Sequence, residues 1–143
     1  MPDCVFCKIV SGEFESSKVY EDESILAFMT IQPVNPGHVL IIPKMHIEMI
    51  SGVDDVTAGR MFALAGKVNT AIRNSGLKTE GVNYFLADGI AAGQEVFHTH
   101  LHVFPRYQDD GFGLTFAPGF KEYKERKILN EAAGKIRVEL EKM

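Results

Sequence analysis

Short apolar stretches separated by polar turns dominate the first two thirds of the chain. Residues 18–30 hold two of them, on either side of the turn Asp22-Glu23-Ser24. Three more lie at residues 38–43, 82–87 and 98–104, and they are rich in β-branched or aromatic side chains. Such residues favour a pleated sheet, and turn residues bound each stretch, so the pattern predicts five strands.

One longer segment follows the 3.6-residue period of an amphipathic helix instead. It is predicted over residues 54–74, and Gly76 suits the position just after its last turn. Its apolar face consists of Met61, Leu64, Ala65, Val68 and Ile72. This face should lie against the sheet.

A second helix is predicted near the C-terminus, over residues 121–139, after an irregular segment at residues 111–119. Its stripe consists of Ile128, Ala132, Ile136 and Leu140. The stripe should pack on the same molecule or on a second subunit. Short connections between strands, with helices inserted between and after them, predict an α+β domain whose sheet is mainly antiparallel.

Length and composition limit the class of protein and the partners it can bind. The chain has 143 residues, of which 45% are hydrophobic, so residues 1–143 are expected to form one domain. The formal net charge is −4 and no basic cluster is present, which argues against binding to nucleic acids or anionic membranes. A single nucleotide needs only one local anion site and is not excluded. The N-terminus lacks the pattern of a secretion signal, so a cytoplasmic location is expected.

The strongest chemical signal is the row His98, His100 and His102, which holds three of the five histidines. In an extended strand these side chains point to one face, roughly 6–7 Å apart. Burying them without partners is costly, which suggests a site. The row could coordinate a metal ion, supply a general base, or supply an imidazole nucleophile.

Nucleophilic attack on phosphorus makes particular demands on an imidazole. The neutral ring is a good nucleophile near pH 7 because its ordinary pKa is about 6.5. One ring nitrogen must donate to a fixed acceptor so that the other keeps its lone pair. Neighbouring groups should donate hydrogen bonds to the phosphate oxygens.

Several motifs in the chain together resemble the histidine triad family. They are HTHLHVFPR preceded by Gly93-Gln94, CVFCKI near the N-terminus, SKVYED, NPGHVLIIPKMHI and AAGQEVFHTH. The resemblance covers most of the chain up to Asp110. It implies a core over about residues 4–110, with residues 111–143 as a C-terminal extension that carries a helix. The Pro-Arg ending and the Cys-x-x-Cys motif are similar to the bacterial branch.

This resemblance also implies a fold, an assembly and an activity. The fold would be α+β, with a five-stranded, mainly antiparallel sheet, one long helix and a C-terminal helix. Two copies would form a homodimer with a continuous sheet. The activity would be hydrolysis of a nucleoside phosphoramidate or a related conjugate of a purine nucleotide, at the α-phosphate.

Catalytic roles follow from the resemblance, position by position. His100 would be the nucleophile and would form a covalent nucleotidyl intermediate that water resolves. His102 would contact the phosphate and assist the leaving group. A backbone carbonyl near His98 would fix the tautomer of His100.

The resemblance implies the substrate contacts as well. Gln94 and Glu95 would line the loop that presents backbone N–H groups to the phosphate. His38 would lie near the triad. Phe28 and other apolar side chains would form a wall of the base pocket, and Thr30 would face the ribose.

Cys4 and Cys7 have the spacing of half a structural zinc site, and a redox pair is the alternative. The resemblance adds His46 and His98, which would complete a closed Cys₂His₂ tetrahedron. Such a site leaves no position for water, so the zinc would be structural.

Two positions depart from the family pattern. Thr30 stands where Asp or Asn usually holds the ribose hydroxyls, and a single hydroxyl cannot replace that grip. Ala87 stands where Asn or Gln normally reaches the phosphate, and a missing donor of this kind can cost roughly 10²–10³ in rate.

Three functions therefore remain open from the sequence. The leading one is a nucleotide hydrolase that uses His100. A second, motivated by Thr30 and Ala87, is a zinc-stabilised nucleotide sensor or partner-binding dimer with little activity. The third is a metallohydrolase whose metal is held by His98, His100 and His102.

Overall fold

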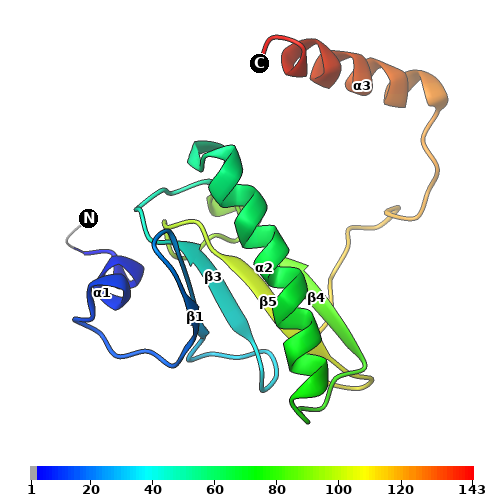
Figure 1. Ribbon diagram of the computed structural model, residues 1–143. Helices are drawn as coiled ribbons and strands as arrows, with labels where there is room; N and C mark the ends of the chain where they lie inside the picture. Colours follow the sequence, from blue (N-terminus) through cyan, green and yellow to red (C-terminus); the bar gives the residue numbers. More distant parts are fainter. Residues whose placement is uncertain (1–2) are drawn as a thin grey trace. The chain divides into compact units, whose positions relative to one another are not determined.

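A computed structural model describes residues 3–143 of the chain, which form two compact units. The first unit ends at Phe112 and the second covers Gly113–Met143. The first contains a five-stranded antiparallel sheet of order β1-β2-β3-β5-β4 (Figure 1). Its strands are β1 (Lys18–Glu21), β2 (Ile25–Met29), β3 (Val39–Pro43), β4 (Gly81–Phe85) and β5 (Leu101–Arg106). The predicted α+β fold is confirmed.

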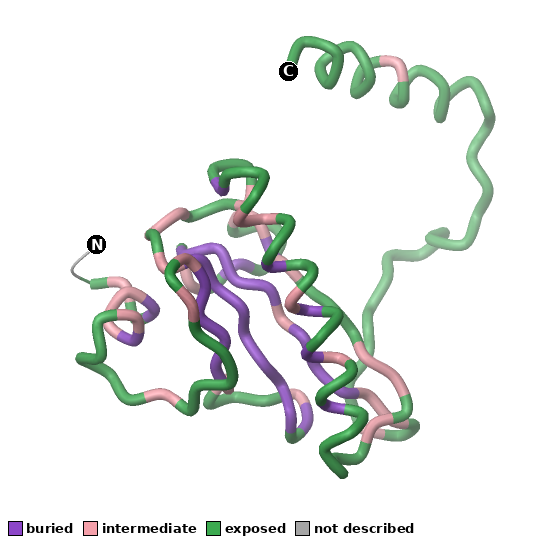
Figure 2. The backbone as a smooth tube through the Cα atoms, in the orientation of Figure 1, coloured by how far each residue is buried: buried purple, intermediate pink, exposed green. Residues whose placement is uncertain are grey.

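Helix α2 (Asp55–Asn74) covers one face of the sheet (Figure 1). Asp54 caps it by accepting a hydrogen bond from Thr57 N–H at 2.9 Å. Its buried residues are Met61, Ala65, Val68 and Ile72, four of the five predicted for its apolar face, while Leu64 is half-buried. They pack against alternate residues of β2, β3 and β5, which are the buried strands of Figure 2.

Helix α1 (Val5–Ser11) covers the other face, and the hydrophobic pattern did not predict it. Its seven residues are too few for a clear helical period. The Sγ atom of Cys4 accepts a hydrogen bond from Cys7 N–H at its start, and Gly12 ends it in a left-handed conformation. Its buried Phe6 and Ile9 contact an apolar layer of Leu26, Phe28, Leu40 and Ile42.

The histidine row lies only partly within a strand, which corrects the prediction of a strand over residues 98–104. Strand β5 begins at Leu101, so His98 and His100 precede it. The neighbouring strand β3 ends at Pro43, which has no N–H to continue the ladder. The side chain of His98 bonds to this end of the strand, since its Nε2–H donates to the Pro43 carbonyl oxygen at 2.7 Å.

The second unit holds helix α3 (Arg126–Leu140), which begins later than predicted. Residues 117–122 form turns instead, with bonds from Phe120 N–H to Ala117 O and from Glu122 N–H to Gly119 O. Ile128, Ile136 and Leu140 are exposed, so the packing predicted for this stripe stays a prediction. No helix in residues 3–143 has the length and apolar character needed to span a membrane.

Candidate catalytic and metal site

The candidate site lies where β5 begins, between the edge of α1 and the end of β3. His98 and His100 are buried just before the strand, and His102 is half-buried on it. In the sheet, His102 pairs with Leu40 of β3 and with Phe85 of β4. Neighbouring strands therefore restrict His102 on both sides, whereas His98 and His100 lie just before the strand begins.

His100 has the tautomer that nucleophilic chemistry requires. Its Nδ1 lies 2.7 Å from the carbonyl oxygen of His98, and a carbonyl can only accept, so Nδ1 carries the proton. The lone pair of the neutral ring is then on Nε2. Burial lowers the pKa of His100 below its ordinary value, which keeps the ring neutral near pH 7.

His38 and His102 form a short chain whose proton positions are also fixed. Val34 N–H donates to His38 Nδ1 at 3.0 Å, so the neutral His38 ring carries its proton on Nε2. That Nε2–H donates to His102 Nδ1 at 2.9 Å, which leaves the proton of His102 on Nε2. Burial lowers the pKa of each ring to about 4, so both are neutral at pH 7.

Cys4, Cys7, His46 and His98 form the cluster that the sequence and the resemblance predicted. Their ligand atoms all lie within 4.8 Å of one another. His98 Nδ1 lies 3.5 Å from Cys4 Sγ and 3.7 Å from Cys7 Sγ, and His46 Nδ1 lies 3.3 Å from Cys7 Sγ. The bond from His98 Nε2 to Pro43 O directs the lone pair of His98 Nδ1 towards the sulfurs.

These distances fit a tetrahedral zinc ion. Zinc bonds of about 2.0–2.3 Å to nitrogen and sulfur give tetrahedron edges of about 3.3–3.8 Å between ligand atoms. The three measured nitrogen–sulfur separations fall in this range. Among residues 3–143 this is the one group of His, Cys, Asp or Glu side chains placed to hold a metal ion, and it does not include His100 or His102. The geometry therefore disfavours a metal ion held by the three histidines of the row.

Gln94 is buried and its side-chain amide is fully engaged within the protein. Its Oε1 accepts from Gly89 N–H at 2.7 Å, and its Nε2 donates to Glu48 O and Val96 O. The amide thus fixes the loop over residues 88–94 and has no donor left for a ligand. Glu95 is exposed, and its charge acts on His100 in the direction of a higher pKa, against the larger effect of burial.

Phe28 lies on β2 and Thr30 directly after it, and Ala87 follows β4 by two residues. Phe28 is 2% exposed and packs edge-on against Phe6 with 5.6 Å between ring centroids. The hydroxyl of Thr30 accepts from Gln32 N–H at 3.2 Å, which occupies part of its hydrogen-bonding capacity. Ala87 is buried and offers no polar side-chain atom.

Sequence reasoning missed two contacts of the site. Phe6, one of the apolar side chains expected at the base pocket, packs edge-on against His100 with 5.1 Å between ring centroids, and this contact was not predicted. Val34 N–H, which sets the His38 tautomer, is a backbone group and leaves no trace in the sequence. The side chain of Arg106 is engaged within the protein, where it donates to Asp110, Asn83 and Phe112 O.

Thr99 offers a prediction about stability. Its side chain is 1% exposed, and its hydroxyl has no hydrogen-bond partner within residues 3–143. Thr99→Val keeps the shape and removes the unpaired group, so it should raise the free energy of unfolding by about 1 kcal/mol. Urea unfolding of both zinc-loaded proteins measures this. A lower midpoint for the variant would mean that the hydroxyl has a partner.

Comparison with known proteins places this site in a family. A model of the HIT domain matches residues 11–109. An uncharacterized HIT-like protein of Borreliella burgdorferi is 48% identical over 116 residues, or 80% of this chain and 83% of the relative. The adenylylsulfatase HINT3 of Arabidopsis thaliana is 38% identical over 108 residues, or 76% of this chain and 54% of that protein.

Solved structures agree with this match. A HIT family member from Bacillus subtilis superposes with a TM-score of 0.83 at 40% identity, over 94% of this chain and 96% of that one. A zinc-bound histidine triad family protein from Mycobacterium smegmatis gives 0.74 at 41% identity, over 82% and 84% of the two chains. With its histidine row, its sheet order and its matched domain, the chain belongs to the HIT family.

Proposed function

We propose that the chain hydrolyses a nucleotide conjugate at its α-phosphorus, with a purine nucleoside 5′-phosphoramidate as the type substrate. The observation that carries this proposal is the 2.7 Å bond from His100 Nδ1–H to the carbonyl of His98, which leaves the Nε2 lone pair free on a buried, neutral ring. The relative that is named an adenylylsulfatase supports a nucleotide conjugate as the substrate class.

Two displacements would complete the reaction. His100 Nε2 attacks the α-phosphorus, a phosphorus–nitrogen bond forms, and the bond to the leaving amine breaks. His102, whose Nε2–H is the ring donor left free by the bond from His38, donates a hydrogen bond to a phosphate oxygen or to the leaving amine, and the amine departs with a proton taken from water. Water then attacks the nucleotidyl-imidazole, which releases the nucleoside monophosphate and restores His100.

Zinc is the metal we propose for the Cys4, Cys7, His46 and His98 cluster. Two thiolates and two imidazoles form a closed set typical of structural zinc, and the zinc-bound relative from Mycobacterium smegmatis supports the choice. Bound zinc would cross-link the start of α1, the segment after β3 and the histidine row. No step of the reaction uses it.

A second function fits the two departures from the family pattern. The Thr30 hydroxyl already accepts from Gln32 N–H, and Ala87 has no donor for a phosphate. A zinc-stabilised nucleotide sensor or partner-binding dimer would need nucleotide binding without fast turnover. Substantial hydrolysis of any nucleotide conjugate by the purified protein would remove this alternative.

A panel of adenosine, guanosine and 2′-deoxyadenosine phosphoramidates tests the substrate class. The wild-type protein should hydrolyse them and should favour the ribonucleotide over the deoxynucleotide by less than about tenfold. About tenfold is the effect expected from one hydrogen bond to the ribose hydroxyl. Thr30→Asp should raise that preference by about tenfold, measured as kcat/KM. Absence of turnover across the panel would overturn the proposed activity, and a strong ribose preference in the wild type would overturn the role of Thr30.

We further propose a homodimer with a continuous sheet. Strand β4 lies at an edge of the sheet, and a groove between it and α2 is lined by Phe62, Tyr84 and Phe85, all exposed. Exposed aromatic side chains beside an unpaired strand are typical of an interface.

Charge at this groove should separate the two copies. Phe62→Asp combined with Tyr84→Asp should give a monomer in light scattering after gel filtration. Val19→Asp, which adds a carboxylate to an exposed apolar position of β1 at the opposite sheet edge, should leave the dimer intact. A monomeric wild type, or a double variant that stays dimeric, would contradict the interface.

A further inference from the structure

Phe6 connects the metal cluster to the candidate nucleophile. It lies between Cys4 and Cys7 in the sequence, and its ring is buried against three aromatic side chains. The ring centroids lie 5.1 Å from His100, 5.8 Å from His98 and 5.6 Å from Phe28, each with a steep interplanar angle of 71–77°. One face of the His100 environment is therefore built by the residue between the two metal-ligating thiols.

The position of Phe6 depends on how α1 is held. Seven residues are too few for a helix that is stable by itself in water. Within the described residues its buried anchors are Phe6 and Ile9, and its first turn carries the Cys4 and Cys7 sulfurs that face His98 and His46. A metal ion in this cluster would fix the first turn of α1 on the segment that carries His100.

The hydrogen bond to His98 O does not by itself fix the His100 ring. It holds one atom, Nδ1, and the ring can still tilt about that contact. Two neighbouring rings restrict this tilt: the Phe6 ring lies edge-on with 5.1 Å between ring centroids, and the His102 ring lies tilted at 4.9 Å. Misplacement of a nucleophile by a small tilt lowers the rate because attack requires close alignment.

We propose that Phe6 is a positioning residue, and that the metal cluster acts on His100 through it. The metal holds the first turn of α1, the turn holds Phe6, and Phe6 holds the His100 ring in the orientation that its bond to His98 O requires. This inference rests on the proposed role of His100 as nucleophile. It differs from a purely structural role of zinc, which would change stability but not the state of the His100 ring.

The metal could also reach His100 along the backbone, because His98 is itself a ligand and its carbonyl accepts from His100. Four protein states separate the two routes: wild type and Phe6→Leu, each zinc-loaded and zinc-stripped. Phe6→Leu keeps an apolar side chain and removes the ring. Ile9→Ala is the matched control, since it removes a buried anchor of the same helix that lies outside the aromatic contacts of His100.

NMR of the histidine rings measures the state of His100 in each protein and needs no substrate. His100 signals are assigned with His100→Asn, and folding of each state is checked by circular dichroism. Zinc-loaded Phe6→Leu should show a shifted His100 ring with faster Nδ1–H exchange, and Ile9→Ala should resemble the wild type. Stripping zinc should shift His100 in the wild type but add little in Phe6→Leu. In zinc-loaded Phe6→Leu, kcat should fall about tenfold with a smaller change in KM.

Two results would overturn the proposal. One is an unchanged His100 ring in zinc-loaded Phe6→Leu, and the other is an equal effect of zinc removal with and without Phe6, which would assign the coupling to the backbone. If the zinc-stripped protein or Phe6→Leu fails to fold, the same His100 signals are compared between zinc-loaded Phe6→Met and zinc-loaded Ile9→Ala. A shifted His100 ring only in Phe6→Met supports the proposal, and an unchanged ring overturns it. Because these signals need no substrate, an inactive protein would refute the proposed function and leave the Phe6 coupling measurable.

Discussion

Replacing His100 by asparagine should reduce hydrolysis of a nucleoside phosphoramidate by about 10⁴-fold or more, because loss of a nucleophile removes the covalent route. Asparagine keeps a polar side chain of similar reach, so the His98 carbonyl can still receive a donor. Nucleotide binding and zinc content should stay close to those of the wild type. Steady-state kinetics, calorimetric titration with the nucleoside monophosphate and elemental analysis measure the three properties.

His102→Asn is the matched control, since it makes the same change two residues further along the row. It removes a hydrogen-bond donor to the phosphate and the leaving group, but not the nucleophile, and loss of one such preorganised donor typically costs about 10²–10³-fold. His102→Asn should therefore keep more activity than His100→Asn on a substrate with a good leaving group. Equal activity of His100→Asn and the wild type would refute the account of the site.

Removal of zinc should lower thermal stability strongly. A ligand at about 1,000 times its Kd stabilises the folded state by about 4 kcal/mol, and for a chain of this size that corresponds to a loss of about 8–16 °C in Tm. The effect is expected because the cluster ties α1 and the segment that holds His46 to the start of the catalytic row. Differential scanning calorimetry with and without a chelator measures it.

The double variant Cys4→Ala, Cys7→Ala supplies the control. It should already have the low Tm of the stripped protein, and the chelator should not lower it further. A chelator that stops turnover at once while leaving Tm unchanged would indicate a catalytic metal instead. Absence of bound metal in protein purified without a metal-affinity step would remove the zinc site altogether.

Much of the sheet and its main helix follow from the sequence because their signals are local. The apolar spacing of α2 reflects the face it buries, and the turn at Asp22 is closed by its own carboxylate, which accepts from Ser24 and Ile25 N–H at 2.9 Å each. The bond from Ser24 N–H, followed by those from the Tyr20 hydroxyl and Ile25 N–H, lowers the pKa of Asp22 to about 2. Strand β5 was less predictable, since its start depends on where β3 ends at Pro43.

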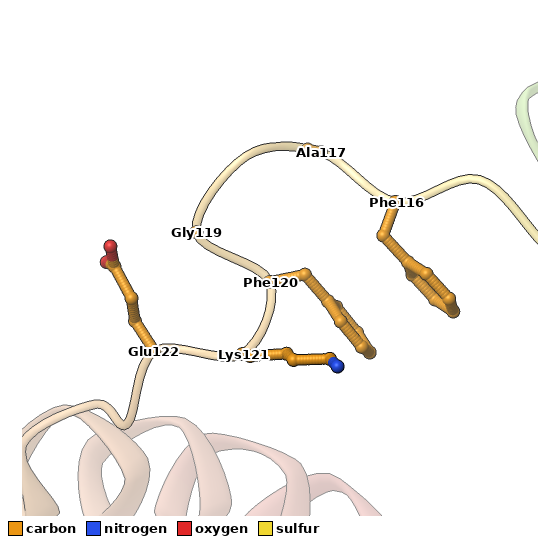
Figure 3. A pocket seen from close by; sticks show the side chains of 6 residues that line it. All are labelled: Phe116, Ala117, Gly119, Phe120, Lys121 and Glu122. Atoms are coloured by element: carbon orange, nitrogen blue, oxygen red, sulfur yellow. The ribbon is translucent and has the colours of Figure 1, made fainter.

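Helices α1 and α3 show two limits of prediction from a pattern. Helix α1 is short, and its position depends on contacts of Phe6 and Ile9 with a distant layer of the sheet. Helix α3 was predicted from an apolar stripe, but it begins only at Arg126, after turns at residues 117–122 that lie beside a surface hollow lined by Phe116 and Phe120 (Figure 3). The stripe predicts an apolar helix face but does not predict which surface packs against it.

Some features of the candidate site are visible in the sequence, and others depend on tertiary contacts. The alternation of His98, His100 and His102 and the spacing of Cys4 and Cys7 are visible in the sequence alone. The two histidine ligands, His46 and His98, needed the family resemblance, and the tautomer of His102 depends on a bond from His38, 64 residues away. Gln94 was predicted to line the loop that presents backbone N–H groups to the phosphate, and the bonds by which its amide fixes that loop are tertiary contacts that the sequence does not reveal.

The covalent intermediate on His100 is the central claim, and the stereochemistry at phosphorus tests it most directly. A nucleoside phosphorothioate conjugate, chiral at the α-phosphorus, is hydrolysed in water enriched in oxygen-18, and the configuration of the product is determined. Two successive in-line displacements, first by His100 and then by water, predict overall retention. Inversion would show a single direct attack by water and would contradict the account.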